Sequence, residues 1–161
     1  MSVARLKDFL DSYGVRYIVI SHSIAYTAQG IAALAHIPGK ELAKTVIVKL
    51  DGKLAMAVLP ASRQVDLPSL RAAANAKTAE LASEMEFRPS FPDCETGAMP
   101  PFGNLYGMAV LADESLVQDE EIAFNAGSHR ELFRMKFNDY LHLVRPAIMK
   151  LAAPVAAHLV A

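Results

Sequence analysis

One lysine stands where an apolar segment begins, at Lys44 in the run Ala43–Val46. The simplest interpretation is a lysine at a strand edge, with its stem on apolar surface and its ammonium in water. The functional interpretation is a fixed cation at the mouth of a sheet, aimed at a phosphate or at a carbonyl oxygen. The sequence leaves both interpretations open.

A second segment that could do chemistry is the glycine- and proline-rich run from Gly97 to Gly103. Its prolines, Pro100 and Pro101, fix the course of the backbone. Its glycines allow backbone N–H groups to approach a ligand closely and to point at a developing oxyanion. The alternative is a rigid surface turn without a ligand.

The third segment is Asn125–His129, a glycine turn between two expected strands. It is either a plain hairpin connection or a loop that presents Ser128 and His129 to a pocket. The weaker candidates are His22 and Cys94. We expect Cys94 to be a small buried hydrophobic residue and not a nucleophile, because no base can be assigned beside it.

The sequence lacks the common catalytic signatures. It contains no G-x-S-x-G, no P-loop, no G-x-G-x-x-G after a strand and no H-E-x-x-H. The five histidines fall in no metal-ligand spacing, and a single cysteine is a poor start for a zinc site. We therefore expect no metal and no cofactor, and a reducing compartment.

Length and charge limit the class of protein. A chain of 161 residues that is 53% hydrophobic can bury one good core, so we expect one domain over residues 1–161. Its 16 basic and 17 acidic residues nearly cancel, which argues against a protein that coats nucleic acid through a broad basic surface. A small local basic patch remains compatible with this balance.

The longest stretch without Asp, Glu, Lys or Arg runs from Tyr17 to Gly39. Polar residues such as His22 and Gln29 interrupt it, and such groups are costly in lipid, so we expect no membrane span. The N-terminus carries Arg5, Lys7 and Asp8 and lacks the apolar region of a secretory signal. The expected location is the cytoplasm.

Periodicity and turn signals give the expected elements. The clearest is a β-hairpin, with apolar runs at Thr45–Leu50 and Leu54–Leu59 around the turn signal Asp51–Gly52. Asp66 and Thr78 are typical helix caps. The remaining expectations are helices at 2–13, 27–37, 66–73 and 78–85, a buried strand at 17–20, an irregular loop at 87–107, strands at 108–112, 122–125 and 132–137, and helices from Asn138 and from about Pro146.

Taken together and in order, several of these segments resemble the YbaK-like family, free-standing relatives of the editing insertion of bacterial prolyl-tRNA synthetase. The resemblance covers roughly residues 1 to 145. It rests on His22–Ala28, Ala43–Lys44–Thr45, Val58–Leu59–Pro60, Gly97–Gly103 and Asn125–Ala126–Gly127. It implies an α+β fold, with one mixed, partly curled sheet and helices packed around it.

The resemblance also implies an activity, hydrolysis of the ester between a mischarged amino acid and the end of tRNA. Lys44 matches the functional lysine of the family, and Gly97–Pro101 matches the loop that lines the aminoacyl pocket. His129 matches a histidine of the alanine-clearing branch, which favours a small amino acid such as alanine on tRNA-Pro. The implied catalytic residues are Lys44, Gly97 and Pro101, and the implied substrate-binding residues are His22, Thr45, Ala98, Met99, Pro100, Phe102, Gly127, Ser128 and His129.

An ester of this kind is already activated, so the reaction needs a positioned water and oxyanion donors more than a strong nucleophile. We therefore expect backbone N–H groups of Gly97–Pro101 to orient the carbonyl and the water. Lys44 is expected to contact the phosphate of the terminal adenosine or the amino acid. Met99 and Phe102 are large and apolar, and they are expected to narrow the pocket in favour of small amino acids.

Two other functions compete with this one. The first is a non-catalytic module that keeps the pocket and binds tRNA or a synthetase. The second is a hydrolase of another small amino-acid ester or amide. The presence of Lys44 together with an intact glycine loop favours catalysis. The expected partners are the acceptor end of aminoacyl-tRNA and an aminoacyl-tRNA synthetase, and the sequence leaves open whether the synthetase recruits the protein.

Overall fold

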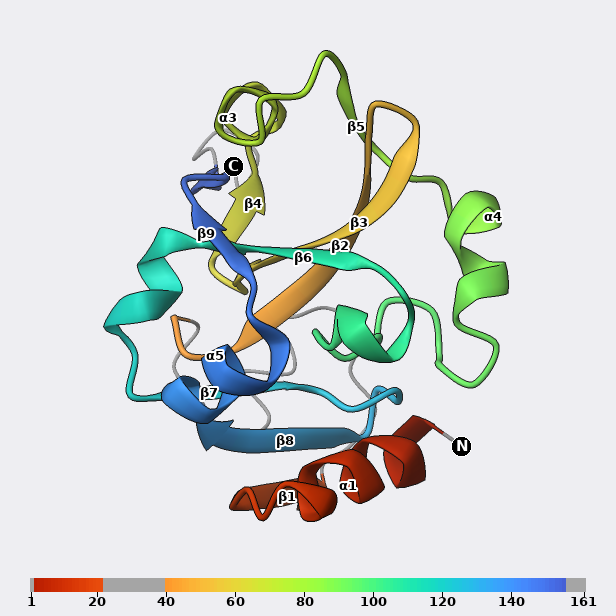
Figure 1. The fold of residues 1–161 in the computed structure, drawn as a ribbon, viewed down its shortest axis with the longest axis vertical. Coiled ribbons are helices and arrows are strands. Elements are labelled where there is room, and N and C mark those ends of the chain that lie inside the picture. Colours follow the sequence, from red (N-terminus) through yellow and green to blue (C-terminus); the bar gives the residue numbers. More distant parts are fainter. Residues whose placement is uncertain (1, 22–39, 156–161) are drawn as a thin grey trace.

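The computed structural model describes residues 2–21 and 40–155 (Figure 1). In these ranges the strands form three hydrogen-bonded sheets of five, three and two strands. The five-stranded sheet has the order β5–β2–β3–β6–β9. Its strands are β5 (Ala79–Leu81), β2 (Ala43–Leu50), β3 (Lys53–Pro60), β6 (Ala109–Asp113) and β9 (Ala147–Met149).

The predicted hairpin is confirmed by β2 and β3. Its register pairs Leu50 with Lys53 at the turn and Ala43 with Pro60 at the open end. Asp51 and Gly52 have φ angles of 51° and 80°, the two positive angles that a tight hairpin turn requires. β2 begins at Ala43, two residues before the start of the predicted strand.

The rest of the five-stranded sheet combines both strand directions. β6 runs parallel to β3, β9 runs parallel to β6, and β5 runs antiparallel to β2. The helix predicted at 78–85 is wrong over most of its length, because residues 79–81 pair with β2 and the helix there begins only at Glu84. The Asp51 carboxylate accepts hydrogen bonds from the N–H groups of Lys77 and Thr78 at 2.8 and 2.9 Å, which turns this segment towards the sheet.

The helix predicted from about Pro146 is also wrong. Residues 147–149 form β9, and the chain then pairs β10 (Ala152–Pro154) with β4 (Arg63–Val65) in the two-stranded sheet. A buried carboxylate explains this path, because Oδ1 of Asp113 accepts the N–H groups of Leu151 and Ala152, both at 3.0 Å. These partners lie 38 and 39 residues away, so no local pattern signals them.

The three-stranded sheet has the order β1–β8–β7, with β1 (Tyr17–Ser21), β8 (Glu131–Lys136) and β7 (Glu121–Asn125) all antiparallel. A single parallel bridge between Leu42 and Ala123 joins β7 to the segment before β2. β1 was predicted to be buried, but it is an edge strand, and Ile18 is 57% exposed. Its outer side has no strand partner among the described residues.

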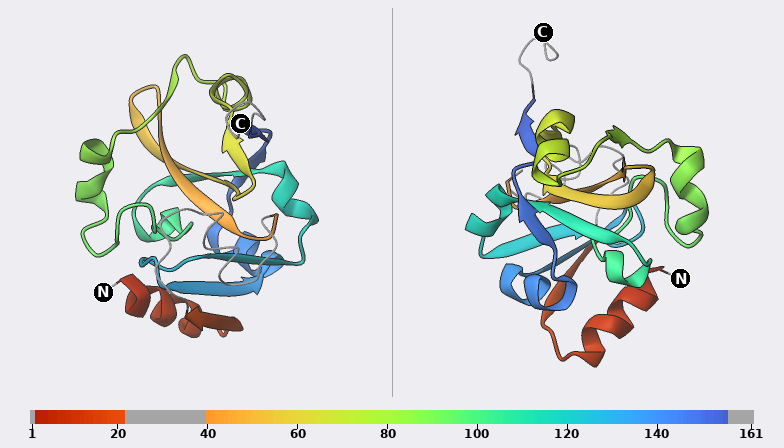
Figure 2. Two further views of the ribbon diagram at one scale, coloured as in Figure 1. Left: turned by 180° about the vertical axis from the view of Figure 1, so that it is seen from behind. Right: turned by 45° about the horizontal axis from the view of Figure 1, so that its top comes forward.

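Four helices lie in the described ranges. They are α1 (Ser2–Ser12), α3 (Leu67–Ala73), α4 (Glu84–Phe87) and α5 (Phe137–Val144), with short 3-10 turns at Arg88–Ser90, Gly103–Leu105 and Glu114–Gln118. Asp66 caps α3 as predicted, since its carboxylate accepts Ser69 N–H. In Figures 1 and 2, α3 lies at one end of the molecule and α1 at the opposite end, beside β8.

The hydrophobic core has two parts, one on each face of the β2–β3 pair. Ile47 of β2 and Val58 of β3 belong to the larger part, together with Leu6 and Leu10 of α1. Val48 and Leu59 belong to the smaller part, with Leu70 of α3. Because side chains alternate along a strand, this division also fixes which face each polar residue of β2 occupies.

The predicted α+β class with mixed strand directions is confirmed, with the strands divided among the three sheets described above. The helix predicted at 27–37 lies outside the described residues. No helix in the described part of the chain is long and apolar enough to cross a membrane.

Candidate functional site

Two of the three segments singled out from the sequence lie against each other. The loop that carries Gly97 and the turn that joins β7 to β8 exchange backbone hydrogen bonds. Glu95 N–H donates to Gly127 O, and Gly127 N–H donates to Ala98 O, both at 2.8 Å. Gly127 and Ala98 are buried. The two loops therefore form one unit, which we call the paired loops (residues 94–102 and 125–130).

His129 makes the most specific contact in the paired loops. Its ring is 4% exposed, and its Nε2 lies 2.7 Å from Thr96 O. A carbonyl oxygen only accepts, so Nε2 carries the hydrogen and donates it. The backbone N–H of His129 donates to Oε2 of Glu95 at 3.3 Å. The imidazole thus braces the backbone on the N-terminal side of Gly97.

Gly97 has a positive φ of 85°, a conformation that favours glycine. A Cβ placed there would lie 3.5 Å from Cε1 of His129. That separation is an ordinary contact for one methyl group, whereas a branched side chain would press on the imidazole. The position requires glycine for its backbone angle and lies directly beside His129.

The proline end of the loop is anchored in the core. Pro100, Pro101 and Phe102 are buried, and the buried Tyr140 hydroxyl donates to Pro101 O at 2.7 Å. The Phe102 ring lies edge-on to the rings of Phe124 and Tyr140, with centroids 5.4 and 5.5 Å apart. This packing fixes the position of the loop backbone relative to the core.

Met99 and Phe102 were expected to narrow a substrate pocket. They are 4% and 0% exposed, and both belong to the larger part of the core. Both side chains are buried beneath the loop, so their size sets the position of the loop backbone. A direct contact with substrate stays a prediction for both residues.

The loop has few N–H groups to offer a ligand. Pro100 and Pro101 have none, and Ala98 N–H donates to Glu95 O at 3.0 Å. Within the part of the chain that the structure describes, the N–H groups of Gly97 and Met99 donate to no protein acceptor. These two are the candidate oxyanion donors of the loop.

Lys44 lies near the start of β2, opposite Leu59 of β3. Its ammonium is half-buried, and burial lowers the pKa of Lys44 from its ordinary value. It forms no ion pair with any described residue. A partly desolvated cation without a carboxylate partner is costly, and it is suited to meet an anionic ligand.

Register decides how Lys44 and Thr45 are oriented. Lys44 shares a face with Leu59, on the side of the smaller core part, whereas Thr45 pairs with Val58, on the side of the larger part. Met99 and Phe102 also belong to the larger part, so Thr45 lies on the same side of the pair as the paired loops. No hydrogen bond or ion pair between described residues joins the Lys44 side chain to those loops.

The remaining candidates are placed as follows. Ser128 is half-buried and its Oγ accepts Arg130 N–H at 3.2 Å. Cys94 is partly buried against the core, with Sγ 3.3 Å from the Tyr106 hydroxyl, which fits the expected packing role. His22 lies outside the described residues. No group of metal-ligating side chains occurs among residues 2–21 and 40–155.

The sequence missed the residues that hold the paired loops in place. Glu95 contributes its backbone and its carboxylate to the unit, and Tyr140 anchors Pro101 from α5. Glu95 was detectable only by its position two residues before Gly97. Nothing in the local pattern around Tyr140 signals a partner 39 residues away.

The family model of the aminoacyl-tRNA editing domain matches residues 22–143. The multifunctional Ser/Thr-tRNA deacylase ProXp-y of Escherichia coli K12 is 29% identical over 150 residues, covering 90% of this chain and 89% of the relative.

Two solved structures share the fold. The structure of hypothetical protein APE2540 superposes with a TM-score of 0.83 at 16% identity, covering 92% of this chain and 99% of that one. A proposed trans-editing enzyme for prolyl tRNA synthetase superposes with a TM-score of 0.80 at 19% identity, covering 94% and 97% of the two chains.

Proposed function

Because the chain belongs to the aminoacyl-tRNA editing domain family, we propose that it hydrolyses the ester bond of mischarged aminoacyl-tRNA and clears small amino acids. The observation that carries this proposal is the pairing of the Gly97 loop with the His129 turn. Their hydrogen bonds hold a positive-φ glycine and two unused N–H groups in a fixed arrangement.

The chemistry asked of the site is modest. An aminoacyl ester is activated, so rate comes from positioning the carbonyl and the water and from stabilising the oxyanion. The N–H groups of Gly97 and Met99 are suited to bind the oxyanion. His129 and Glu95 act as positioning residues, because they hold the backbone on the N-terminal side of Gly97.

Lys44 supplies the charge in this proposal. Its ammonium contacts the phosphate of the terminal adenosine or the amino acid, and burial strengthens such a contact by removing competing water. Since Lys44 and Thr45 lie on opposite faces of the β2–β3 pair, we assign Lys44 to the RNA side of the substrate and Thr45 to the side of the paired loops.

The amino acid is the finer part of the proposal. The resemblance of His129 to the alanine-clearing branch favours alanine on tRNA-Pro, while the Escherichia coli relative is named for Ser/Thr-tRNA. All three side chains are small. An apolar pocket separates neighbouring substrates by only about 1–3 kcal/mol per methylene, or about 10- to 200-fold, so we expect alanine, serine and threonine esters all to be cleaved, at rates that differ within this range.

Several predictions from the sequence remain part of the proposal. They are a single domain over residues 1–161, a cytoplasmic location, action as a free-standing enzyme, and an aminoacyl-tRNA synthetase as a second partner. The acceptor end of tRNA is the partner on which the reaction depends.

The test is a panel of tRNAs mischarged with alanine, serine, threonine, proline or leucine. We expect rapid release of the three small residues and slow release of the two larger ones. Preferential release of proline or leucine would contradict the small-residue assignment. Binding of tRNA without release of any amino acid would indicate the non-catalytic module instead.

A further inference from the structure

Two polar grooves adjoin at the end of the five-stranded sheet where β2 begins and β3 ends. One has a volume of about 320 Å³ and is lined by Lys40, Pro60 and Arg63 among others. The second has a volume of about 400 Å³ and is lined by Arg63 and Lys150 among others. Arg63, Ser115 and Gln118 line both, so the two form one continuous depression, which we call the Arg63 groove.

Three cations border the Arg63 groove, and one of them, Lys40, lies close enough to Asp119 to influence its charge. Lys40, Arg63 and Lys150 form no ion pair with any residue of the described ranges. The hydroxyl of Ser62 and the amide of Gln118 line the groove beside them. Cations together with neutral donors are the groups that proteins use to bind phosphate oxygens.

The carboxylates that face the groove are Asp113, Glu114 and Asp119. Asp113 is 1% exposed and already accepts hydrogen bonds from Ser115, Leu151 and Ala152. Burial and the nearby Glu41 raise the pKa of Asp119, while the charge of Lys40 opposes that rise. Glu114 is the one exposed carboxylate of this set.

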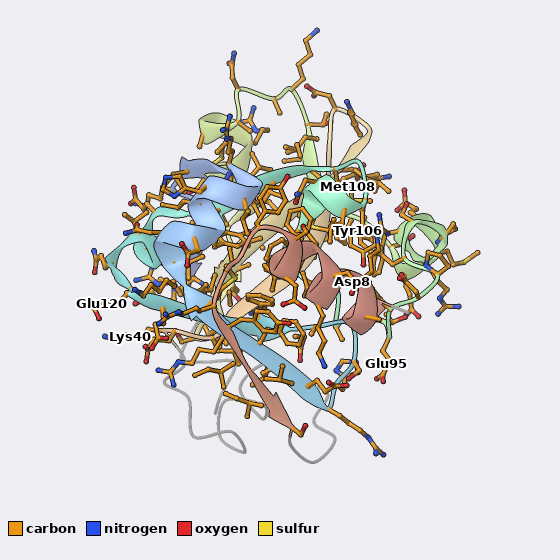
Figure 3. All side chains as sticks on the ribbon, turned by 60° about the horizontal axis from the view of Figure 1, so that its bottom comes forward. Asp8, Lys40, Glu95, Tyr106, Met108 and Glu120 are labelled. Atoms are coloured by element: carbon orange, nitrogen blue, oxygen red, sulfur yellow. The ribbon has the colours of Figure 1, made fainter. Side chains whose placement is uncertain are left out.

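The groove lies near the start of β2, where Lys44 is found. Pro60 pairs with Ala43, the residue before Lys44, and Ala61 N–H donates to Leu42 O at 2.7 Å. Lys40 and Lys44 are four positions apart, a span of at most about 14 Å of chain. In Figure 3, Lys40 lies at the opposite edge of the molecule from Glu95 of the paired loops.

We propose that the Arg63 groove binds the phosphate backbone of the tRNA acceptor stem, with Lys40, Arg63 and Lys150 as its cations. This inference rests on the proposed function, because it extends the Lys44 contact along the same RNA. A chain with a net charge of -1 has little long-range attraction for RNA, so a local cluster of unpaired cations is needed to hold the stem.

The experiment measures the affinity of uncharged tRNA over a range of salt concentrations for Arg63→Ala, Lys150→Ala and the double variant. Lys53→Ala is the matched control, an exposed cation at the turn end of β3, outside both grooves. We expect each single groove variant to weaken binding about 3- to 10-fold and to reduce the salt slope by about 0.7–0.9, and the double variant to reduce the slope by about twice as much. The control should match the wild type.

Lys150→Glu provides a second test that does not threaten folding, because Lys150 is exposed. It should weaken binding more than Lys150→Ala at low salt. Hydrolysis of a short substrate, an aminoacylated CCA trinucleotide, should be unchanged in all groove variants, because it lacks the stem.

Unchanged tRNA affinity in the double variant would overturn the inference, as would an equal loss in Lys53→Ala or tRNA binding too weak to measure in the wild type. Normal tRNA binding with lost affinity for a synthetase would assign the groove to a protein instead. Should the wild type bind tRNA through the groove but release no amino acid, the proposed function fails while the groove stands.

Discussion

Gly52 and Gly97 have nearly the same backbone angle, with φ of 80° and 85°, but they lie in very different surroundings. A Cβ at Gly52 would meet nothing within 4 Å, whereas one at Gly97 would contact His129. The turn at Gly52 closes a hairpin between adjacent strands. The turn at Gly97 is tied to residues more than thirty positions away. The same local requirement therefore serves folding in one place and a candidate site in the other.

The largest effect should come from placing the same side chain at both glycines. Valine strains a positive-φ position by about 1–3 kcal/mol, so Gly52→Val and Gly97→Val should lose similar stability. Only Gly97→Val should also displace His129 and the N–H groups of the loop. We expect its single-turnover deacylation rate to fall about 100- to 1000-fold, as on loss of an oxyanion donor.

Melting temperatures of both variants supply the control for this comparison. A wild-type rate in Gly97→Val would indicate that the Gly97 loop is only a structural turn and takes no part in the reaction. An equal loss of rate in Gly52→Val would show that both variants act through stability alone.

The second effect concerns Lys44, at the open end of the hairpin that Gly52 closes. Lys44→Ala removes a charge-assisted contact of about 1.5–3 kcal/mol, so we expect a loss of about 10- to 100-fold in rate. Lys44→Arg should not restore full activity, because a planar fork does not occupy the site of a compact ammonium. Near-normal turnover in Lys44→Ala would indicate that Lys44 is only a solvated lysine at a strand edge.

The lowered pKa of Lys44 adds a pH test. Burial disfavours its charged form in the folded state, so the penalty is present below the folded pKa. The penalty disappears as the pH rises towards the ordinary value near 10.5, and stability should increase across that window. Lys44→Met should abolish this increase and melt no lower than the wild type, which thermal scans at several pH values would check.

A smaller effect should come from Glu95, an exposed residue that links the two halves of the paired loops. Glu95→Ala removes one hydrogen bond to His129 N–H, worth about 0.5–1.5 kcal/mol, so turnover should fall about 2- to 10-fold. Glu95→Gln keeps an acceptor oxygen and should retain most of the rate. Glu120→Ala, at an exposed carboxylate without a side-chain partner among the described residues, is the control.

Hydrogen exchange gives a readout of the Glu95 contact that does not depend on turnover. The amide of His129 should exchange faster in Glu95→Ala and at the wild-type rate in Glu95→Gln. Equal protection in all three proteins would remove Glu95 from the set of positioning residues.

The smallest effect is expected from a zinc chelator. Neither the spacing of the five histidines nor the described part of the structure offers a ligand cluster. Deacylation should therefore proceed at the same rate in 1,10-phenanthroline, with magnesium retained to keep the tRNA folded. Inhibition that added zinc reverses would contradict a metal-free mechanism.

The sequence by itself determined the features that depend on neighbouring residues. The Asp51–Gly52 turn, the Asp66 cap and the apolar runs of β2 and β3 all follow from local backbone and side-chain preferences. The glycine–proline composition of 87–107 likewise ruled out long regular elements there. The order of Lys44, the Gly97 loop and Asn125–Gly127 also carried the family resemblance.

Only the tertiary structure decided what those segments contact. Residues 79–81 and 147–149 became strands because β2 and β6 offered unpaired edges, and such pairing energy overrides a weak helical pattern. The partners of His129, Pro101 and Asp113 lie 33 to 39 residues away. Hydrogen bonds over such separations depend on how the chain packs, so no local pattern could have placed Glu95 and His129 around Gly97.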